Sequence, residues 1–156
     1  MIICQIEASS YDELVTYMRY QADDTFSSLK DEERLLAFAT KLNTCAEICF
    51  CRDNGHLVGM IAFYANGQGA DFAYIPLVYV SPDYRKKGLF SRMLSIVEKH
   101  VKERGFSEIR VEVLKNNDNA IKCYLNDGFE VVEDHGNKWL LRLSLFHKYA
   151  CVEVVD

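Results

Sequence analysis

The sequence predicts one α/β (α+β) three-layer domain, with a mixed, mostly antiparallel central sheet flanked by helices in the order β-α-α-β-β-β-α-β-α-β-β. Three successive, nearly continuous apolar strands in the first half of the chain indicate a sheet covered on both faces. A helical pattern between two later strands predicts a parallel crossover. A length of 156 residues with 49% hydrophobic side chains suffices for one full core. We assign residues 1–145 to this domain and 146–156 to a C-terminal tail.

The first part of the chain predicts a strand and two helices. Ile2 to Glu7 is typical of a short strand, and a serine at position 9 or 10 can cap the helix that follows. The second helix begins behind the acidic residues 31–33 and places its apolar residues at helical spacing up to Leu42. Between the helices, residues 21–28 are polar and are expected to form a connection.

From residue 46 the hydrophobic period changes to that of strands. Strands are predicted at Ile48 to Arg52, Leu57 to Ala65 and Phe72 to Val80. The first two are joined by Asp53-Asn54-Gly55, a known hairpin turn signal. A helix is then predicted from Leu89 to Arg104, because an apolar stripe runs along it and Gly105 can end it in a left-handed conformation.

The last part of the chain predicts a strand, a short helix and a closing hairpin. Their expected ranges are Ile109 to Leu114, Asn119 to Asn126, Phe129 to Glu133 and Trp139 to Leu145. A glycine at position 128 stops the helix. The exposed hairpin and the tail after it are compatible with a homodimer.

Composition excludes several classes of function. The net charge of -5 argues against general nucleic-acid binding, which requires a basic face. No run of about 18 apolar residues is present, so no membrane span is expected. The six cysteines contain no Cys-x-x-Cys pair, so we expect no metal site. With no signal peptide before them, they are expected to be reduced thiols in a cytoplasmic protein.

The junction of strand and helix between Val80 and Ser91 predicts an anion-binding loop. Backbone N–H groups at a helix N-terminus lack intrahelical partners, and the helix dipole adds positive potential there. Arg85, Lys86 and Lys87 stand in this loop, and no acidic residue occurs between Asp83 and Glu98. The sequence therefore predicts a phosphorylated ligand.

Two motifs, in this order along the chain, resemble those of a known family. The first is Arg85-x-x-Gly88 after an apolar strand that ends in Ser81-Pro82, and the second is Asn117-x-x-Ala120-Ile121-x-x-Tyr124-x-x-x-Gly128-Phe129. Together with the order of elements, they resemble the GNAT superfamily of N-acetyltransferases. Arg52-x-x-Gly55 also matches the short first pattern, but it lies in a hairpin turn with no helix behind it.

The resemblance implies binding of acetyl-coenzyme A as cosubstrate. The family holds the pyrophosphate on loop amides, while the pantetheine arm pairs with the preceding strand. The cofactor-binding residues implied here are Val78, Tyr79, Val80, Arg85, Lys86, Lys87, Gly88, Leu89, Phe90, Ser91, Asn117, Ala120 and Tyr124. Phe90 departs from the family pattern, which has Gly or Ala there. Since Phe90 is in phase with the apolar stripe of its helix, we expect it to turn into the core.

The resemblance also implies a catalytic acid. Tyr124 matches the family tyrosine that protonates the coenzyme A thiolate, and packing in the core is its structural alternative. The base is open: Asp23 or Asp24 can attract or deprotonate a cationic amine, and Asp24 is our catalytic candidate. Both lie, with Phe26, in the connection that walls the acceptor site in this family, and the alternative for that connection is a solvated acidic loop.

The sequence thus predicts an N-acetyltransferase that transfers the acetyl group of acetyl-coenzyme A to a primary amine. The acceptor is expected to be a small molecule, with an amino sugar as one candidate, and the amine to attack the thioester directly. The alternative is an acyl-coenzyme A sensor or partner-binding module without catalysis. Neither a nucleic acid nor a membrane is an expected partner.

Overall fold

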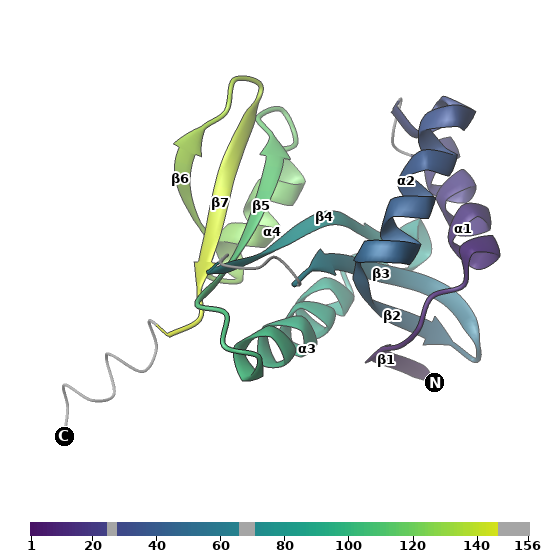
Figure 1. The fold of residues 1–156 in the computed structure, drawn as a ribbon, viewed down its shortest axis with the longest axis horizontal. Coiled ribbons are helices and arrows are strands. Elements are labelled where there is room, and N and C mark those ends of the chain that lie inside the picture. The colour runs from purple at the N-terminus through teal and green to yellow at the C-terminus, as the bar shows by residue number, and fades with distance from the viewer. Residues whose placement is uncertain (25–27, 66–70, 147–156) are drawn as a thin grey trace. The chain divides into compact units, whose positions relative to one another are not determined.

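The computed structural model describes residues 1–24, 28–65 and 71–146 (Figure 1). Its elements follow the predicted order. They are β1 (Ile2–Ile6), α1 (Tyr11–Asp24), the 3-10 turn η1 (Ser28–Lys30), α2 (Glu32–Cys45), β2 (Glu47–Asp53), β3 (His56–Tyr64), β4 (Phe72–Val80), the 3-10 turn η2 (Pro82–Tyr84), α3 (Leu89–Glu103), β5 (Glu108–Leu114), α4 (Asp118–Asn126), β6 (Glu130–Asp134) and β7 (Lys138–Ser144).

The strands form one sheet in the order β1-β2-β3-β4-β5-β7-β6. β4 and β5 pair in parallel from Phe72↔Glu108 to Ile75↔Val111. The pairs β1–β2, β2–β3, β5–β7 and β6–β7 are antiparallel. The predicted α/β fold with a mixed, mostly antiparallel sheet flanked by helices is therefore confirmed.

By its internal contacts the chain divides into two compact units. The first comprises Met1–Tyr64 and Leu77–Val97, and the second comprises Ala65–Pro76 and Glu98–Asp156. The backbone passes from one unit to the other within β4 and again within α3. The assignment of residues 1–145 to a single domain stays a prediction.

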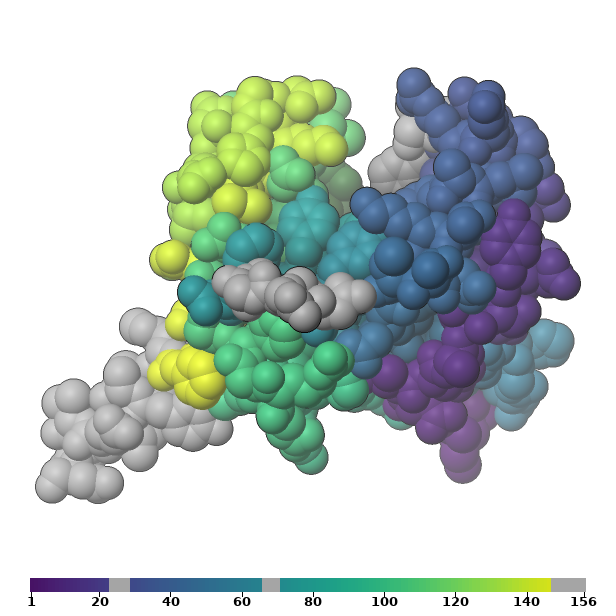
Figure 2. Space-filling view, viewed as in Figure 1, coloured from purple at the N-terminus to yellow at the C-terminus, as the bar shows by residue number. Residues whose placement is uncertain are grey.

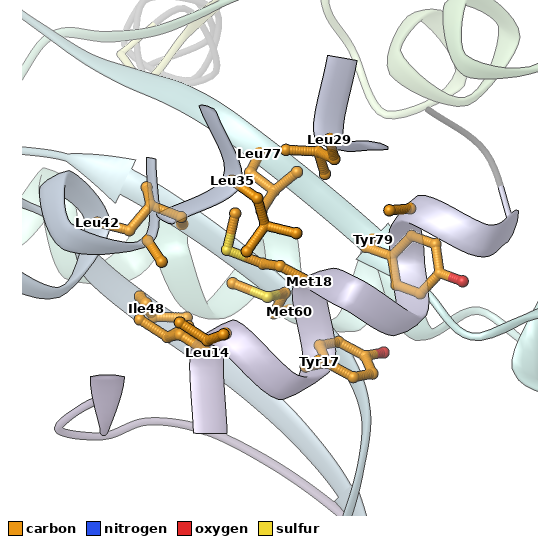
Figure 3. Packing of buried hydrophobic residues seen from close by; sticks show 14 of the residues in the cluster. Leu14, Tyr17, Met18, Leu29, Leu35, Leu42, Ile48, Met60, Leu77 and Tyr79 are labelled. Atoms are coloured by element: carbon orange, nitrogen blue, oxygen red, sulfur yellow. The ribbon is translucent and has the colours of Figure 1, made fainter. Parts of the chain in front are cut away.

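The core of the first unit lies between two helices and the sheet. Leu14 and Met18 of α1 and Leu35 of α2 are buried against side chains of β2, β3 and β4 (Figure 3). Because side chains of a strand alternate between its faces, Met60 and Ala62 of β3 both face this cluster. In Figure 2, α1 (purple) and α2 (dark blue) adjoin each other on the surface, as expected for helices that share one core.

The other face of this unit is covered by α3. The side chain of Met93 packs against Gly59, which is next to Met60. A Cβ atom at Gly59 would lie 3.2 Å from the methyl group of Met93. Met93, Leu94 and Val97 of α3 are fully or almost fully buried. Helices on both faces explain why β3 is buried over most of its length rather than at alternate residues.

In the second unit, α4 is joined to β6 by a tight turn. Gly128 has a φ of +101°, which glycine adopts most readily, and a Cβ there would lie 3.3 Å from Leu143 of β7. The ring of Tyr124 meets that of Phe129 edge to face at 5.1 Å. Both rings are buried, so the end of the second motif forms part of the core of this unit.

The structure corrects two expectations. First, α1 extends to Asp24, so residues 21–24 are helical and do not belong to a connection. Gln21 and Ala22 are buried in the helix, and the side-chain amide of Gln21 lies 3.5 Å from the sulfur of Met60. Because Gln21 is polar although it is buried, this helical turn has the sequence of an exposed connection, which explains the wrong prediction.

Second, Cys4 and Cys51 form a disulfide, whereas all six thiols were expected to be reduced. The two residues face each other across the antiparallel strands β1 and β2, with their Cα atoms 4.1 Å apart. The pairing follows from strand register, which the spacing of cysteines along the sequence does not reveal. The bond closes a loop over a sequence separation of 47 residues.

We expect thiol titration of the unfolded protein to find two fewer reactive thiols before reduction than after it. Cys4→Ser should abolish that difference, whereas Cys123→Ser on α4 should preserve it. By loop-closure entropy, reduction should also lower the free energy of unfolding by at most about 4 kcal/mol. Equal thiol counts before and after reduction would show that the bond does not form.

Candidate functional site

The junction of β4 and α3 in the first unit has the geometry of an anion-binding loop. β4 ends at Val80, η2 follows, and α3 begins at Leu89. The amide of Ser81 donates to the carbonyl of Val58 at 2.9 Å, which fixes the end of β4 beside the start of β3. At the helix end, the amide of Arg92 donates to the carbonyl of Gly88 at 3.0 Å, so the helical hydrogen bonds begin at Gly88.

Two residues of the loop adopt left-handed backbone conformations. Lys86 has a φ of +61° and Gly88 a φ of +80°. When the sign of φ alternates along a loop in this way, successive N–H groups turn toward one side and form a concavity that suits anions. A Cβ atom at Gly88 would meet no atom within 4 Å, so the space above this residue is open.

The basic side chains of the loop are exposed and are held by local contacts. Arg85 donates from Nε to the carbonyl of Val80 at 2.8 Å, and its guanidinium lies 5.4 Å from the ring centre of Tyr79. Lys87 lies 5.5 Å from the ring centre of Tyr84. Because the first turn of α3 contains no acidic residue, the positive potential of the loop is not offset there.

Phe90, the residue that departs from the family pattern, is half-buried. Leu89, beside it, is 4% exposed and precedes Met93 and Val97 at spacings of four residues. Leu89 therefore begins the most deeply buried row of α3. The expectation that Phe90 turns into the core is met only in part.

The second motif lies on α4 in the second unit. Asn117 is the N-cap of this helix, and its side-chain oxygen accepts from the amide of Ala120 at 3.2 Å. Tyr124 is 6% exposed. Burial raises the pKa of its phenol above the usual value of 10, with the neighbouring Cys123 and Tyr74 as lesser causes. The phenol is therefore protonated at neutral pH, and its raised pKa makes it a weaker acid than an exposed tyrosine.

A hydrogen-bonded group that the sequence analysis did not identify lies on β5 and the β6–β7 hairpin of the second unit. Glu112 accepts from the hydroxyl of Tyr74 at 3.0 Å and lies 2.9 Å from Nδ1 of His135. Nε2 of His135 lies 2.7 Å from Glu133. Glu112 lies between the buried residues Val111 and Val113, so its side chain is on the less buried face of β5. This alternation can be read from the sequence, but only the folded hairpin brings His135 to Glu112.

These contacts shift the pKa values of His135 and Glu112. The carboxylates of Glu112 and Glu133 raise the pKa of His135 above 6.5. The hydrogen bond from His135, followed by that from Tyr74, lowers the pKa of Glu112 against a smaller effect of burial. A carboxylate that is ionised at neutral pH and faces a hydrogen-bonded tyrosine can accept a proton or attract an ammonium group.

The acceptor-site residues predicted between the first helices cannot be placed in a site. Phe26 and the side chains of Asp23 and Asp24 lie outside the described residues. Within the described ranges, no group of His, Cys, Asp and Glu side chains could hold a metal ion. None of the helices described is long and apolar enough to cross a membrane.

The interactions of His135 predict a pH-dependent stability. Because its pKa is raised in the folded state, the stabilisation by Glu112 and Glu133 is fully present below pH 6.5 and is lost as the pH rises through the folded pKa. At pH values below 6.5, we therefore expect His135→Gln to lower the midpoint temperature of thermal unfolding. At higher pH, the same substitution should have less effect on that temperature. Fluorescence of Trp139, the sole tryptophan, reports unfolding of this unit.

The matched control is His56→Gln, a histidine in the β2–β3 hairpin of the first unit. His56→Gln should leave unchanged the pH dependence of the unfolding transition that Trp139 fluorescence reports. A constant difference between wild type and His135→Gln from pH 5 to 9 would contradict the assignment.

Comparisons with known proteins agree with this geometry. The model of the acetyltransferase (GNAT) family matches residues 8–129. The UPF0157 protein YqkA of Bacillus subtilis is 32% identical over 98 residues, which are 63% of this chain and 27% of that protein. The uncharacterized N-acetyltransferase MJ1207 of Methanocaldococcus jannaschii is 30% identical over 87 residues, 53% of this chain and 38% of that protein. The matched region thus spans well under half the length of these curated relatives.

A solved structure shows the same fold. The PaiA N-acetyltransferase of Thermoplasma acidophilum, crystallised in complex with coenzyme A, superposes with a TM-score of 0.72 at 19% identity. The superposition covers 91% of this chain and 99% of that protein. Because the family match extends over both motifs and most of the chain, the protein belongs to the GNAT family of acetyltransferases.

Proposed function

We propose that this protein is an acetyl-coenzyme A-dependent N-acetyltransferase that acts on a primary amine of a small molecule. The observation that carries the proposal is the β4–α3 loop. It combines left-handed conformations at Lys86 and Gly88, open space above Gly88 and a helix N-terminus without acidic residues. Such a loop suits a diphosphate, because a helix N-terminus and nearby lysines favour anions and a Cβ atom at Gly88 would meet no atom within 4 Å.

The roles of the cofactor-binding residues follow the family pattern. Loop residues 85–91 would hold the pyrophosphate, and the backbone of Val78, Tyr79 and Val80 would pair with the pantetheine arm. Asn117 and Ala120 would contribute through the N-terminus of α4, which Asn117 caps. Acetyl-coenzyme A supplies an activated thioester whose carbonyl carbon the amine can attack.

Two proton transfers are required for this reaction. The departing thiolate takes a proton, and Tyr124 is our candidate for giving it, because it matches the family tyrosine in this role and its phenol is protonated at neutral pH. The attacking amine must be neutral and must lose a proton in forming the amide. Asp24 is our candidate base from the sequence, and Glu112 is a second candidate, because it is ionised and already accepts a hydrogen bond from Tyr74.

The choice of a small amine as acceptor rests on charge. Asp23 and Asp24 end α1 with two consecutive carboxylates, which attract an ammonium group. Release of free thiol from acetyl-coenzyme A in the presence of a panel of primary amines tests the activity. Binding of acetyl-coenzyme A with no thiol release from any amine would instead favour a coenzyme A sensor.

Gly88→Glu should weaken binding of acetyl-coenzyme A by roughly 10- to 100-fold, since it places bulk and negative charge where the diphosphate would lie. Gly55→Glu is a closely matched control. Gly55 has a φ of +88°, an equally open Cβ position and the same Arg-x-x-Gly pattern, but it lies in the β2–β3 turn. Calorimetry should show unchanged affinity for Gly55→Glu, and equal losses in both variants would refute the assignment of the loop.

Tyr124→Phe should slow acetyl transfer by roughly 10- to 1,000-fold with little change in the affinity for acetyl-coenzyme A. The substitution keeps the ring that packs on Phe129 and removes only the proton donor. Steady-state rates at saturating acetyl-coenzyme A measure this effect, and the unfolding midpoint checks that the core is intact. A rate equal to that of wild type would remove Tyr124 from the mechanism.

A further inference from the structure

The anion-binding loop is anchored at both of its ends on one pair of residues from neighbouring strands. Before the loop, the hydroxyl of Tyr84 donates to the carboxylate of Asp53 at 2.6 Å. After the loop, the guanidinium of Arg92 in α3 donates to the carbonyl of Ile2 at 3.0 Å. Ile2 and Asp53 face each other across the antiparallel strands β1 and β2. Both flanks of the loop therefore depend on the pairing of β1 with β2.

The disulfide lies next to this anchoring pair. Cys4 and Cys51 are cross-strand partners two residues further along β1 and β2. A Cβ atom at Gly59 would lie 3.6 Å from the Cβ of Cys51 and 3.2 Å from the methyl group of Met93. Cys51 is therefore on the face of the sheet that α3 covers. The disulfide thus joins the two strands that anchor the loop, and it lies on the side of the helix that follows the loop.

Without the disulfide, β1 is held unevenly. It is an edge strand of the described sheet, so its backbone pairs with β2 on one side. Beyond its C-terminal end, Glu7 accepts from Nε of Arg52 at 2.8 Å, which keeps that end close to β2. At the N-terminal end, Met1 is 84% exposed, and its ion pair with Asp53 is solvated and contributes little. Reduction is therefore expected to loosen the end of β1 at Ile2 without detaching the strand.

The disulfide is accessible from one side. Cys51 is fully buried, whereas Cys4 is half-buried on the edge strand. A dithiol can therefore attack the sulfur of Cys4 with one thiolate, and the sulfur of Cys51 leaves and takes up a proton. The second thiol of the reductant then displaces Cys4 as a thiol, and the reductant becomes a disulfide. Burial raises the pKa of the nearby Cys49 thiol to about 12, so Cys49 stays protonated and does not attack the disulfide.

We propose that the disulfide of Cys4 with Cys51 is a redox switch for the anion-binding loop. In the oxidised protein the anchoring pair holds the loop in its binding conformation, and reduction weakens the affinity for acetyl-coenzyme A. The physical cause is conformational entropy, because a loop that is loose at its flanks must be ordered when the ligand binds. Tyr84 and Arg92 are positioning residues in this device. The inference rests on the proposed function, since it takes the loop as the site of the diphosphate.

The test is calorimetry of acetyl-coenzyme A binding to the whole protein with and without dithiothreitol, with thiol titration to confirm each redox state. We expect reduction to weaken binding by about two- to tenfold, the range that one hydrogen bond contributes. Cys4→Ser should bind as weakly as the reduced wild type and should not respond to dithiothreitol. Cys123→Ser on α4, in the second unit, should keep the full response.

Tyr84→Phe tests whether the effect passes through the anchor. It keeps the ring and removes the hydrogen bond to Asp53. In the oxidised protein it should weaken binding by about two- to tenfold. In the reduced protein it should have no measurable effect, because the anchor that it removes is already loose.

The control for general destabilisation is Leu42→Ala, which leaves a cavity in the core of the first unit. Leu42 lies apart from Tyr79 of β4 in Figure 3, and the substitution touches neither the disulfide nor the loop. Leu42→Ala should bind acetyl-coenzyme A as wild type does and should keep the response to dithiothreitol. If it bound as weakly as the reduced protein, lost stability would explain the effect and the proposal would be wrong.

Two further outcomes would overturn the switch and leave the loop as the binding site. One is equal affinity in the two redox states, and the other is an equal effect of Tyr84→Phe in both. If neither redox state binds acetyl-coenzyme A, the proposed function fails and the switch fails with it.

Discussion

The covering of the sheet on both faces is the constraint on which the first unit depends. β3 is buried along most of its length, with Met60 facing α1 and α2 and Gly59 facing α3. Gly59 leaves room for Met93, so α3 packs closely on this face. The position of α3 in turn fixes where its N-terminus meets the end of β4. The anion-binding loop is therefore a consequence of how the strands are packed as well as of its own residues.

The loop illustrates how the element that follows a turn distinguishes two sites that share a short motif. Arg52-x-x-Gly55 and Arg85-x-x-Gly88 share a pattern, and both glycines have positive φ values with open space around them. In the first case a strand follows, and Arg52 is bound by Glu7 and Glu13. In the second a helix follows and adds its dipole and its first amides. The element behind the turn, and not the turn itself, gives only the second of them the geometry of an anion site.

The sequence predicted best what depends on local pattern. The predicted and observed ranges of β4 are the same, and those of α3 differ by one residue at its end, because apolar periodicity and a following glycine define them. The sequence predicted less well the contacts between residues that lie far apart along the chain. The disulfide of Cys4 with Cys51 and the contact of His135 with Glu112 both require the strands to pair in the correct register. The polar sequence of residues 21–24 concealed a helical turn, since a buried glutamine resembles a solvated one.

The segment from Ser81 to Gly88 serves two opposite electrostatic environments within a few residues. Asp83 and Tyr84 line a cavity of the first unit whose walls also include Asp12, Glu13 and Asp53, and the basic residues Arg85, Lys86 and Lys87 follow directly after them. Arg85 turns back to the carbonyl of Val80 and the ring of Tyr79. Acidic and basic side chains thus follow one another within a few residues, and the hydrogen bond and ring contact of Arg85 hold its guanidinium against the end of β4.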